Sequence, residues 1–117
     1  MKYHSYMNDR KEAEFILSLL DEKKCENVLC IDTSKNSSIA NYVIICTASS
    51  STASRAIAGF LEEKTKGTLH LARTDGEKTG QWIVLDFISI IVHVFLEETR
   101  SFYNLEKLLD ADKFKIN

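Results

Sequence analysis

His93 is the first residue of this chain that could do chemistry, because an imidazole transfers protons near neutral pH. It lies in the apolar segment IIVHVF, and Asp86 precedes it by a few residues. No serine, cysteine or second carboxylate lies where it would complete a catalytic set, and His4 and His70 do not have the spacing of a metal site. We therefore interpret His93 as a structural or interface residue, and we expect no catalytic residue, no metal and no other cofactor.

The serine-rich segment CTASSSTAS at residues 46–54 is the second candidate, because hydroxyls and backbone amides at a helix start can bind phosphate. It lacks the glycines and the lysine of the common phosphate-binding loops. Asp86 also has no second carboxylate nearby with which to hold magnesium. Helix capping is the favoured interpretation, and a nucleotidyltransferase-like enzyme is the alternative.

The composition limits the classes of protein to consider. The chain has 117 residues, of which 44% are hydrophobic and 27% charged, so we expect one domain over 1–117 with its core at about 9–109. Its net charge of −2 argues against direct sequence-specific nucleic acid binding. We find neither an apolar stretch of membrane-spanning length nor a signal-peptide core, and we expect a cytoplasmic protein without membrane contact.

The cysteines Cys25, Cys30 and Cys46 are odd in number, so they cannot all pair within one chain. None belongs to a CxxC motif, and no histidine is close in sequence to activate one as a nucleophile. We therefore expect reduced and mostly buried thiols.

Three segments have helical periodicity. Asp9 and Glu12 have the spacing of a capping box at the start of the first segment, and Gly67 ends the second. The apolar stripes are Ala13, Ile16, Leu17 and Leu20 in residues 9–24; Ala53, Ala56, Ile57, Phe60 and Leu61 after the serines; and Phe102, Leu105 and Leu109 in residues 97–109. These patterns predict helices that pack against a sheet.

Short runs rich in β-branched residues predict the strands of that sheet. The runs are residues 27–32, 42–47, 68–72, 82–87 and 90–95. The first two and the last two are predicted to pair antiparallel, whereas the helix before 68–72 predicts a parallel β-α-β crossover; residues 73–81 are predicted to be a loop. The fold class is therefore α/β, a single domain with a mixed sheet of about five strands flanked by helices.

The predicted hairpin decides which side chains share a face. With a two-residue turn at 88–89, Val84 lies opposite His93, and Trp82 and Asp86 lie on the same face as His93. A three-residue turn would reverse that relation.

The charged segment after the last strand is typical of a solvated helix start, but it contains Arg100 and Tyr103. Together with Trp82 and Phe95, these are the residue types that dominate protein interfaces when they are exposed together. The pattern therefore indicates an interface more than an active site.

The stretch WIVLDFISIIVHVFLEETRSFYNLEKL, residues 82–108, closely resembles the signature of the ribosomal silencing factor family, also called Iojap-like proteins. The segment IDTSKNSSIANYVIICTASSSTASRAIA and the pair Asp75-Gly76 also resemble the pattern of that family, so the resemblance covers roughly residues 10–109. The match at residues 82–108 rests on Trp82, Asp86, Ile91, Val92, His93, Phe95, Glu98, Arg100, Tyr103, Leu105, Glu106 and Leu108.

The resemblance implies a nucleotidyltransferase-like fold without established catalysis. Proteins of the family bind the large ribosomal subunit through its fourteenth large-subunit protein and sterically block association with the small subunit, which represses translation under nutrient limitation. Members often form homodimers, and related organelle proteins assist subunit assembly. The positions that it implies for partner binding are Trp82, Asp86, His93, Phe95, Glu98, Arg100, Tyr103 and Leu105.

Some positions depart from the family pattern. They are Asn41 for an aspartate, Ala48 for a glycine, Ile88 and Ser89 for a glycine-aspartate turn, Leu96 for a proline or polar residue, and Leu109 for a tryptophan. The turn change is expected to alter the hairpin, and the missing tryptophan to reshape part of the docking surface. A large-subunit assembly factor and a structural partner of another complex remain further alternatives.

Overall fold

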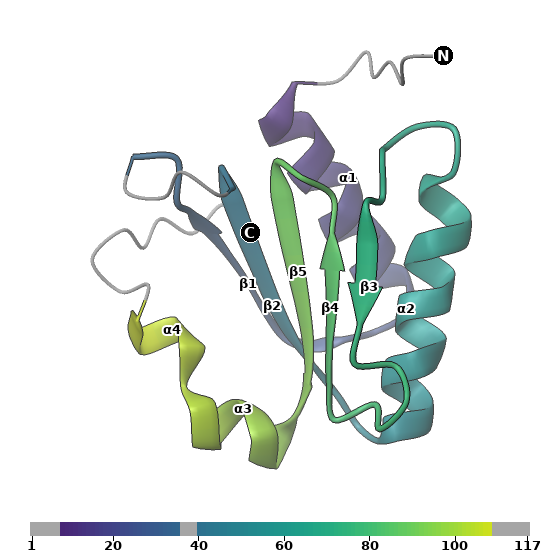
Figure 1. Ribbon diagram of the computed structural model, residues 1–117, viewed down its shortest axis with the longest axis vertical. Coiled ribbons are helices and arrows are strands. Elements are labelled where there is room, and N and C mark those ends of the chain that lie inside the picture. Colours follow the sequence, from purple (N-terminus) through teal and green to yellow (C-terminus); the bar gives the residue numbers. More distant parts are fainter. Residues whose placement is uncertain (1–7, 36–39, 109–117) are drawn as a thin grey trace.

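The computed structural model describes residues 8–35 and 40–108, which form one five-stranded sheet with helices on both of its faces (Figure 1). The elements are α1 (Asp9–Glu22), β1 (Glu26–Asp32), β2 (Tyr42–Ala48), α2 (Ser51–Thr65), β3 (Arg73–Asp75), β4 (Trp82–Asp86), β5 (Ile90–Leu96), α3 (Glu97–Tyr103) and α4 (Leu105–Leu108). The predicted α/β class with a mixed sheet is confirmed. Within the described ranges, no helix has the length and apolar character needed to cross a bilayer.

The strands are ordered β1-β2-β5-β4-β3, with β5 in the middle of the sheet. β2 and β5 are parallel, whereas β1 with β2, β4 with β5, and β3 with β4 are antiparallel. The predicted first pair and the predicted hairpin are therefore confirmed. Every residue of β2 is buried, as expected for a strand that is covered on both faces.

The predicted strand at residues 68–72 is wrong. The Leu69 amide donates to the Thr65 carbonyl at 2.9 Å, so the chain continues to turn at the end of α2, and Leu69 is buried in the core. The strand that follows is β3, in the segment predicted as a loop. β3 runs in the same direction as β2 but at the far edge of the sheet, because β5 and β4 lie between them.

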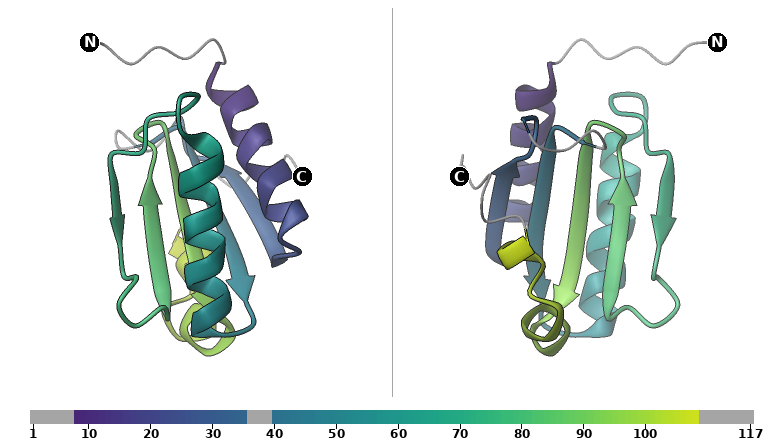
Figure 2. Two further views of the ribbon diagram at one scale, coloured as in Figure 1. Left: turned by 90° about the vertical axis from the view of Figure 1, so that its right-hand side faces the viewer. Right: turned by 60° about the vertical axis from the view of Figure 1, so that its left-hand side comes forward.

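α1 and α2 lie side by side on one face of the sheet (Figure 2). Asn8 caps α1, and Asp9 instead accepts a hydrogen bond from the Asn41 side chain, so the predicted capping box is wrong. Ser50 caps α2, as the serine-rich segment predicted. The apolar stripes differ in detail: Leu17 is only partly buried and Ala56 is exposed, whereas Leu19, Ser54 and Ala58 are buried.

The opposite face carries a smaller apolar cluster beneath α3 and α4. It consists of Ile31, Val43, Ile45 and Phe95, with Leu29, Trp82 and Leu105 packed against it. The single helix predicted at 97–109 is wrong, because Asn104, with a φ of +47°, separates α3 from α4. Phe102 of the predicted stripe is 81% exposed, and Leu109 lies outside the described residues.

The β4–β5 hairpin turns through an unfavourable backbone conformation at Ile88. The Phe87 carbonyl accepts a hydrogen bond from the Ser89 amide at 2.9 Å, which closes a three-residue γ-turn around Ile88 at a φ of +74°. A β-branched residue is strained at positive φ, and the 54% exposed side chain of Ile88 gains little from burial. The register is nevertheless the one predicted for a two-residue turn, with Val84 opposite His93.

We expect Ile88→Gly to increase the free energy of unfolding by about 1 kcal/mol, because relief of the strain exceeds the entropy cost of glycine. Urea unfolding of both proteins measures the change. Ser89→Gly is the matched control, since Ser89 lacks a positive φ and the same substitution should destabilise there. Equal effects of the two variants would contradict the strain assigned to Ile88.

Candidate functional site

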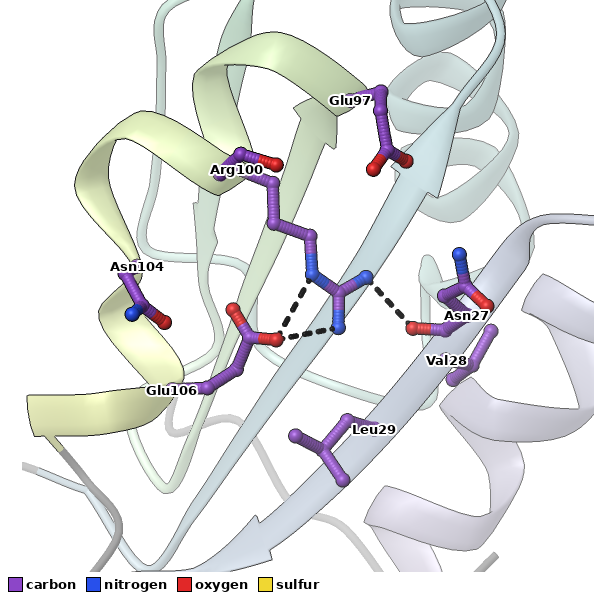
Figure 3. Close-up of a pocket in the computed structure, with 8 residues that line it drawn as sticks. Asn27, Val28, Leu29, Glu97, Arg100, Asn104 and Glu106 are labelled. Atoms are coloured by element: carbon purple, nitrogen blue, oxygen red, sulfur yellow. Dashed lines mark hydrogen bonds and ion pairs between the residues drawn. The ribbon is translucent and has the colours of Figure 1, made fainter.

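Arg100 of α3 joins four elements through its guanidinium group (Figure 3). Nη1 donates to the Asn27 carbonyl of β1 at 2.7 Å and to the Thr47 hydroxyl of β2 at 2.8 Å. Nε and Nη2 both donate to Glu106 Oε2 of α4, at 3.2 and 3.1 Å. The Arg100 side chain is only 11% exposed, so this residue holds α3 and α4 against the sheet from within the protein.

Local backbone conformation places the partners of Arg100. β1 shifts register between Glu26 and Leu29, and Asn27 lies inside this irregularity at a φ of +49°, which removes its carbonyl from the regular ladder. Asn104 turns the chain between α3 and α4, so that Glu106 points back toward Arg100 (Figure 3).

A polar hollow of about 690 Å³ opens over the Arg100 contacts. It is lined by Asn27, Val28, Leu29, Glu97, Arg100, Ser101, Asn104 and Glu106. Among the described residues, no three or more histidine, cysteine, aspartate or glutamate side chains are grouped to hold a metal ion. The part of the lining that the structure describes has no histidine or cysteine, so it offers charge and hydrogen bonds and no nucleophile–base pair.

Trp82 and His93 form the centre of an aromatic group at the α3 end of the sheet. The Trp82 Nε1–H donates to His93 Nδ1 at 3.0 Å, across the β4–β5 pair. Trp82 also stacks on Phe95, with ring centroids 4.8 Å apart, and contacts Tyr103 at the same centroid distance. Phe102 meets Tyr103 edge to face at 5.0 Å.

His93 is neutral in this setting. Burial lowers its pKa to about 4, because the charged imidazolium is poorly solvated there. Because Nδ1 accepts the tryptophan hydrogen bond, the ring proton resides on Nε2. The imidazole therefore acts as a hydrogen-bond acceptor that orients Trp82, an arrangement that fits the structural or interface role inferred from the sequence.

Only part of the predicted set comes together at this place. Trp82, His93 and Tyr103 meet there, and Glu98 is exposed at the start of α3. Phe95 is fully buried beneath Trp82. Like Phe95, the remaining predicted residues near this end, Arg100 and Leu105, support the surface from below.

Asp86 lies apart from the rest of the predicted set. It ends β4 at the opposite end of the strand from Trp82, and its Oδ1 accepts the Ile88 amide at 2.8 Å. Its role in the structure is to hold the hairpin turn.

Two residues that contribute to this site, Phe102 and Thr47, were not identified as site residues from the sequence. Phe102 was assigned to a core stripe, because a continuous helix would have turned it inward; the break at Asn104 leaves it exposed. Thr47 is an ordinary strand threonine in the sequence, and its hydroxyl is an internal acceptor for Arg100. No sequence signal indicates that pairing, since the two residues are far apart along the chain.

The chain is similar to known proteins in sequence and in fold. The family model "Ribosomal silencing factor during starvation" matches residues 7–117. The chain is 30% identical over 103 residues to Ribosomal silencing factor RsfS of Bacillus subtilis (strain 168), covering 87% of each chain, and 35% identical over 97 residues to the protein of that name from Haemophilus influenzae, covering 82% of this chain and 95% of that one. A crystal structure of a Chromobacterium violaceum protein superposes with a TM-score of 0.86 at 26% identity, covering 89% of this chain and 88% of that one.

We expect Arg100→Met to lower the free energy of unfolding by about 3 kcal/mol, because it leaves Glu106, the Asn27 carbonyl and the buried Thr47 hydroxyl without their donor. Arg10→Met is the matched control, since the Arg10–Glu14 pair is about half exposed and should contribute less than about 1 kcal/mol. Urea unfolding at neutral pH measures both changes. Losses of similar size would show that Arg100 does not hold α3 and α4 in place.

We expect acid to destabilise the protein through His93. Its pKa is lower in the folded protein than in the unfolded chain, so its contribution is complete above about pH 6.5 and is lost as the pH falls toward 4. Between pH 7.5 and pH 5 this loss should be about 2 kcal/mol in the free energy of unfolding. The wild type should therefore lose more stability than His93→Gln over that interval, and identical pH profiles would contradict the low pKa.

Proposed function

This chain belongs to the ribosomal silencing factor family, and we propose on that premise that it binds the large ribosomal subunit through its fourteenth large-subunit protein. Bound there, it occupies space needed by the small subunit, prevents the two subunits from joining and represses translation under nutrient limitation. The protein acts in the cytoplasm and carries out no reaction. The observation that carries this proposal is the aromatic surface at the α3 end of the sheet.

We define this aromatic surface as Trp82, His93, Phe102 and Tyr103. Phe102 and Tyr103 are 81% and 52% exposed, and neighbouring exposed aromatic side chains of this size are typical of an interaction site. A shallow hollow of about 670 Å³ adjoins them, lined also by Glu97 and Glu98. Aromatic anchors beside a charged rim are the usual composition of a protein-binding surface, and the two glutamates favour a basic partner.

The aromatic surface is held in shape before any partner arrives. The His93 hydrogen bond fixes the Trp82 ring, and the contacts of Arg100 fix the helix that carries Tyr103. A surface of this kind loses little conformational entropy on binding, which favours affinity. Steric exclusion requires only such a rigid and tightly bound obstacle, so no moving part or bound nucleotide is needed.

Large-subunit assembly and homodimer formation are the alternatives that use the same surface. An assembly factor would bind large-subunit precursors and leave the joining of mature subunits unchanged. A dimer built on the aromatic surface would compete with the ribosome for it, and ribosome binding would then weaken as the protein concentration rises. An enzyme would instead show saturable stabilisation by nucleotide with magnesium.

We expect Phe102→Ala to weaken binding to isolated large subunits at least tenfold, since an exposed aromatic anchor is lost without a change in the core. Co-sedimentation measures the affinity, and the joining of small to large subunits should recover in parallel. Ile88→Asn is the matched control, because it also removes an exposed apolar side chain, at the opposite end of β4, and should bind normally.

Three results would count against the proposal. The wild type could fail to bind mature large subunits, or it could bind them without reducing subunit joining, which would favour the assembly role. If Ile88→Asn lost affinity while Phe102→Ala retained it, the partner would dock at the hairpin end of the sheet.

A further inference from the structure

Two of the three cysteines, Cys25 after α1 and Cys46 in β2, pack in the same apolar cluster. The Cys25 amide donates to the Leu20 carbonyl at 3.1 Å and the Lys24 amide to the Asp21 carbonyl at 3.0 Å, which is the hydrogen-bond pattern of a Schellman motif. Lys24 has the left-handed φ of +55° that this motif requires. The motif turns the Cys25 side chain toward the core, where it packs against the cluster that contains Cys46.

Cys46 faces the same core from β2. Glu26 and Thr47, the residues that follow the two cysteines, pair across the antiparallel strands β1 and β2, so Cys25 and Cys46 lie diagonally across the pair on the face that packs against this core. Cys25 is partly exposed, whereas Cys46 is fully buried. One thiol is thus reachable from solvent, and the second lies inside the core against which the first packs.

The surroundings of the two sulfurs differ in the direction that favours reaction at Cys25. The hydrogen bond from Cys46, the backbone amide of Cys25 and the nearby Lys23 ammonium lower the pKa of Cys25, although burial opposes them. The hydrogen bond to Cys25 and burial raise the pKa of Cys46. The thiolate is the reactive form of cysteine, so Cys25 is the nucleophile of the pair and Cys46 the resolving thiol.

We propose that Cys25 and Cys46 are an oxidant-sensitive pair that hydrogen peroxide converts to an intramolecular disulfide. The Cys25 thiolate attacks one peroxide oxygen, the O–O bond breaks, and the released hydroxide takes a proton to become water. Cys46 then attacks the sulfur of the resulting sulfenic acid, the S–O bond breaks, and the hydroxide that leaves takes the Cys46 proton. Two thiols are oxidised to one disulfide, and one peroxide is reduced to two waters.

The disulfide would connect the carboxyl end of α1 to β2 beside the contacts of Arg100. Asn27 and Thr47, which both accept hydrogen bonds from Arg100, lie within two residues of Cys25 and Cys46. The cross-link closes the chain between residues 25 and 46 and reduces the conformational freedom of the unfolded state. This inference is independent of ribosome binding, because it rests on the thiols alone.

Cys30 provides the matched control. It is fully buried, and burial raises its pKa to about 12, so its thiol is far less reactive than that of Cys25. Trypsin cleaves after Lys24, Lys35 and Arg55, which leaves Cys25 and Cys30 together on peptide 25–35 and Cys46 on peptide 36–55. A Cys30→Ala variant therefore identifies which cysteine of the first peptide has reacted.

The experiment treats the folded protein with hydrogen peroxide and measures its intact mass, its tryptic peptides and its thermal midpoint. We expect the loss of two hydrogen atoms and a cross-link between peptides 25–35 and 36–55 in both the wild type and Cys30→Ala. Neither Cys25→Ser nor Cys46→Ser should form that cross-link. Oxidation should also raise the Tm by roughly 5 °C or more, and dithiothreitol should reverse the change.

Other products would overturn the proposal. They are an unchanged mass, stable oxygen adducts on Cys25 without a cross-link, a disulfide between two protein molecules, or a cross-link that disappears in Cys30→Ala. Because Cys25→Ser retains Cys46 and the core, its circular dichroism spectrum verifies that the loss of the cross-link does not arise from unfolding.

Discussion

The burial of one guanidinium group organises the functional end of this protein. Arg100 is too polar to lie inside without partners, and the fold supplies one from each of three elements: the Asn27 carbonyl, the Thr47 hydroxyl and the Glu106 carboxylate. These contacts bring α3 and α4 onto the open face of the sheet. The irregularity in β1 and the left-handed Asn104 bring two of these partners, Asn27 and Glu106, within reach of the guanidinium group.

The two faces of the sheet contribute differently: one carries the main hydrophobic core, and the other carries the aromatic surface. α1 and α2 bury the larger apolar cluster on one face, which provides most of the hydrophobic stabilisation. Among the described residues, the other face is covered beneath α3 and α4. There Trp82 lies over Phe95, and its hydrogen bond to His93 fixes the orientation of its ring. A neutral imidazole in this position is useful because it satisfies the indole N–H without placing a charge in the aromatic surface.

The sequence predicted much of this arrangement, and its errors have physical causes. The hairpin register and the shared face of Trp82 and His93 follow from period-two alternation, which a short connection preserves. The prediction of a strand at 68–72 was wrong because Leu69 can be buried beneath the end of α2 as well as in a sheet. Phe102 was assigned to the core because periodicity assumes a continuous helix, and a single left-handed residue ended it.

The sequence by itself determined the fold class, the strand and helix segments with strong periodicity, and the family signature at residues 82–108, because local patterning and residue identity are written along the chain. Only the tertiary structure decided which signature residues face solvent and which lie inside. Phe95 and Arg100 are residue types that often contact a binding partner. In this structure Phe95 is buried beneath Trp82, and Arg100 holds α3 and α4 against the sheet. Their roles depend on contacts between residues that are separated in sequence, Phe95 with Trp82 and Arg100 with Thr47, and no local pattern encodes those distances.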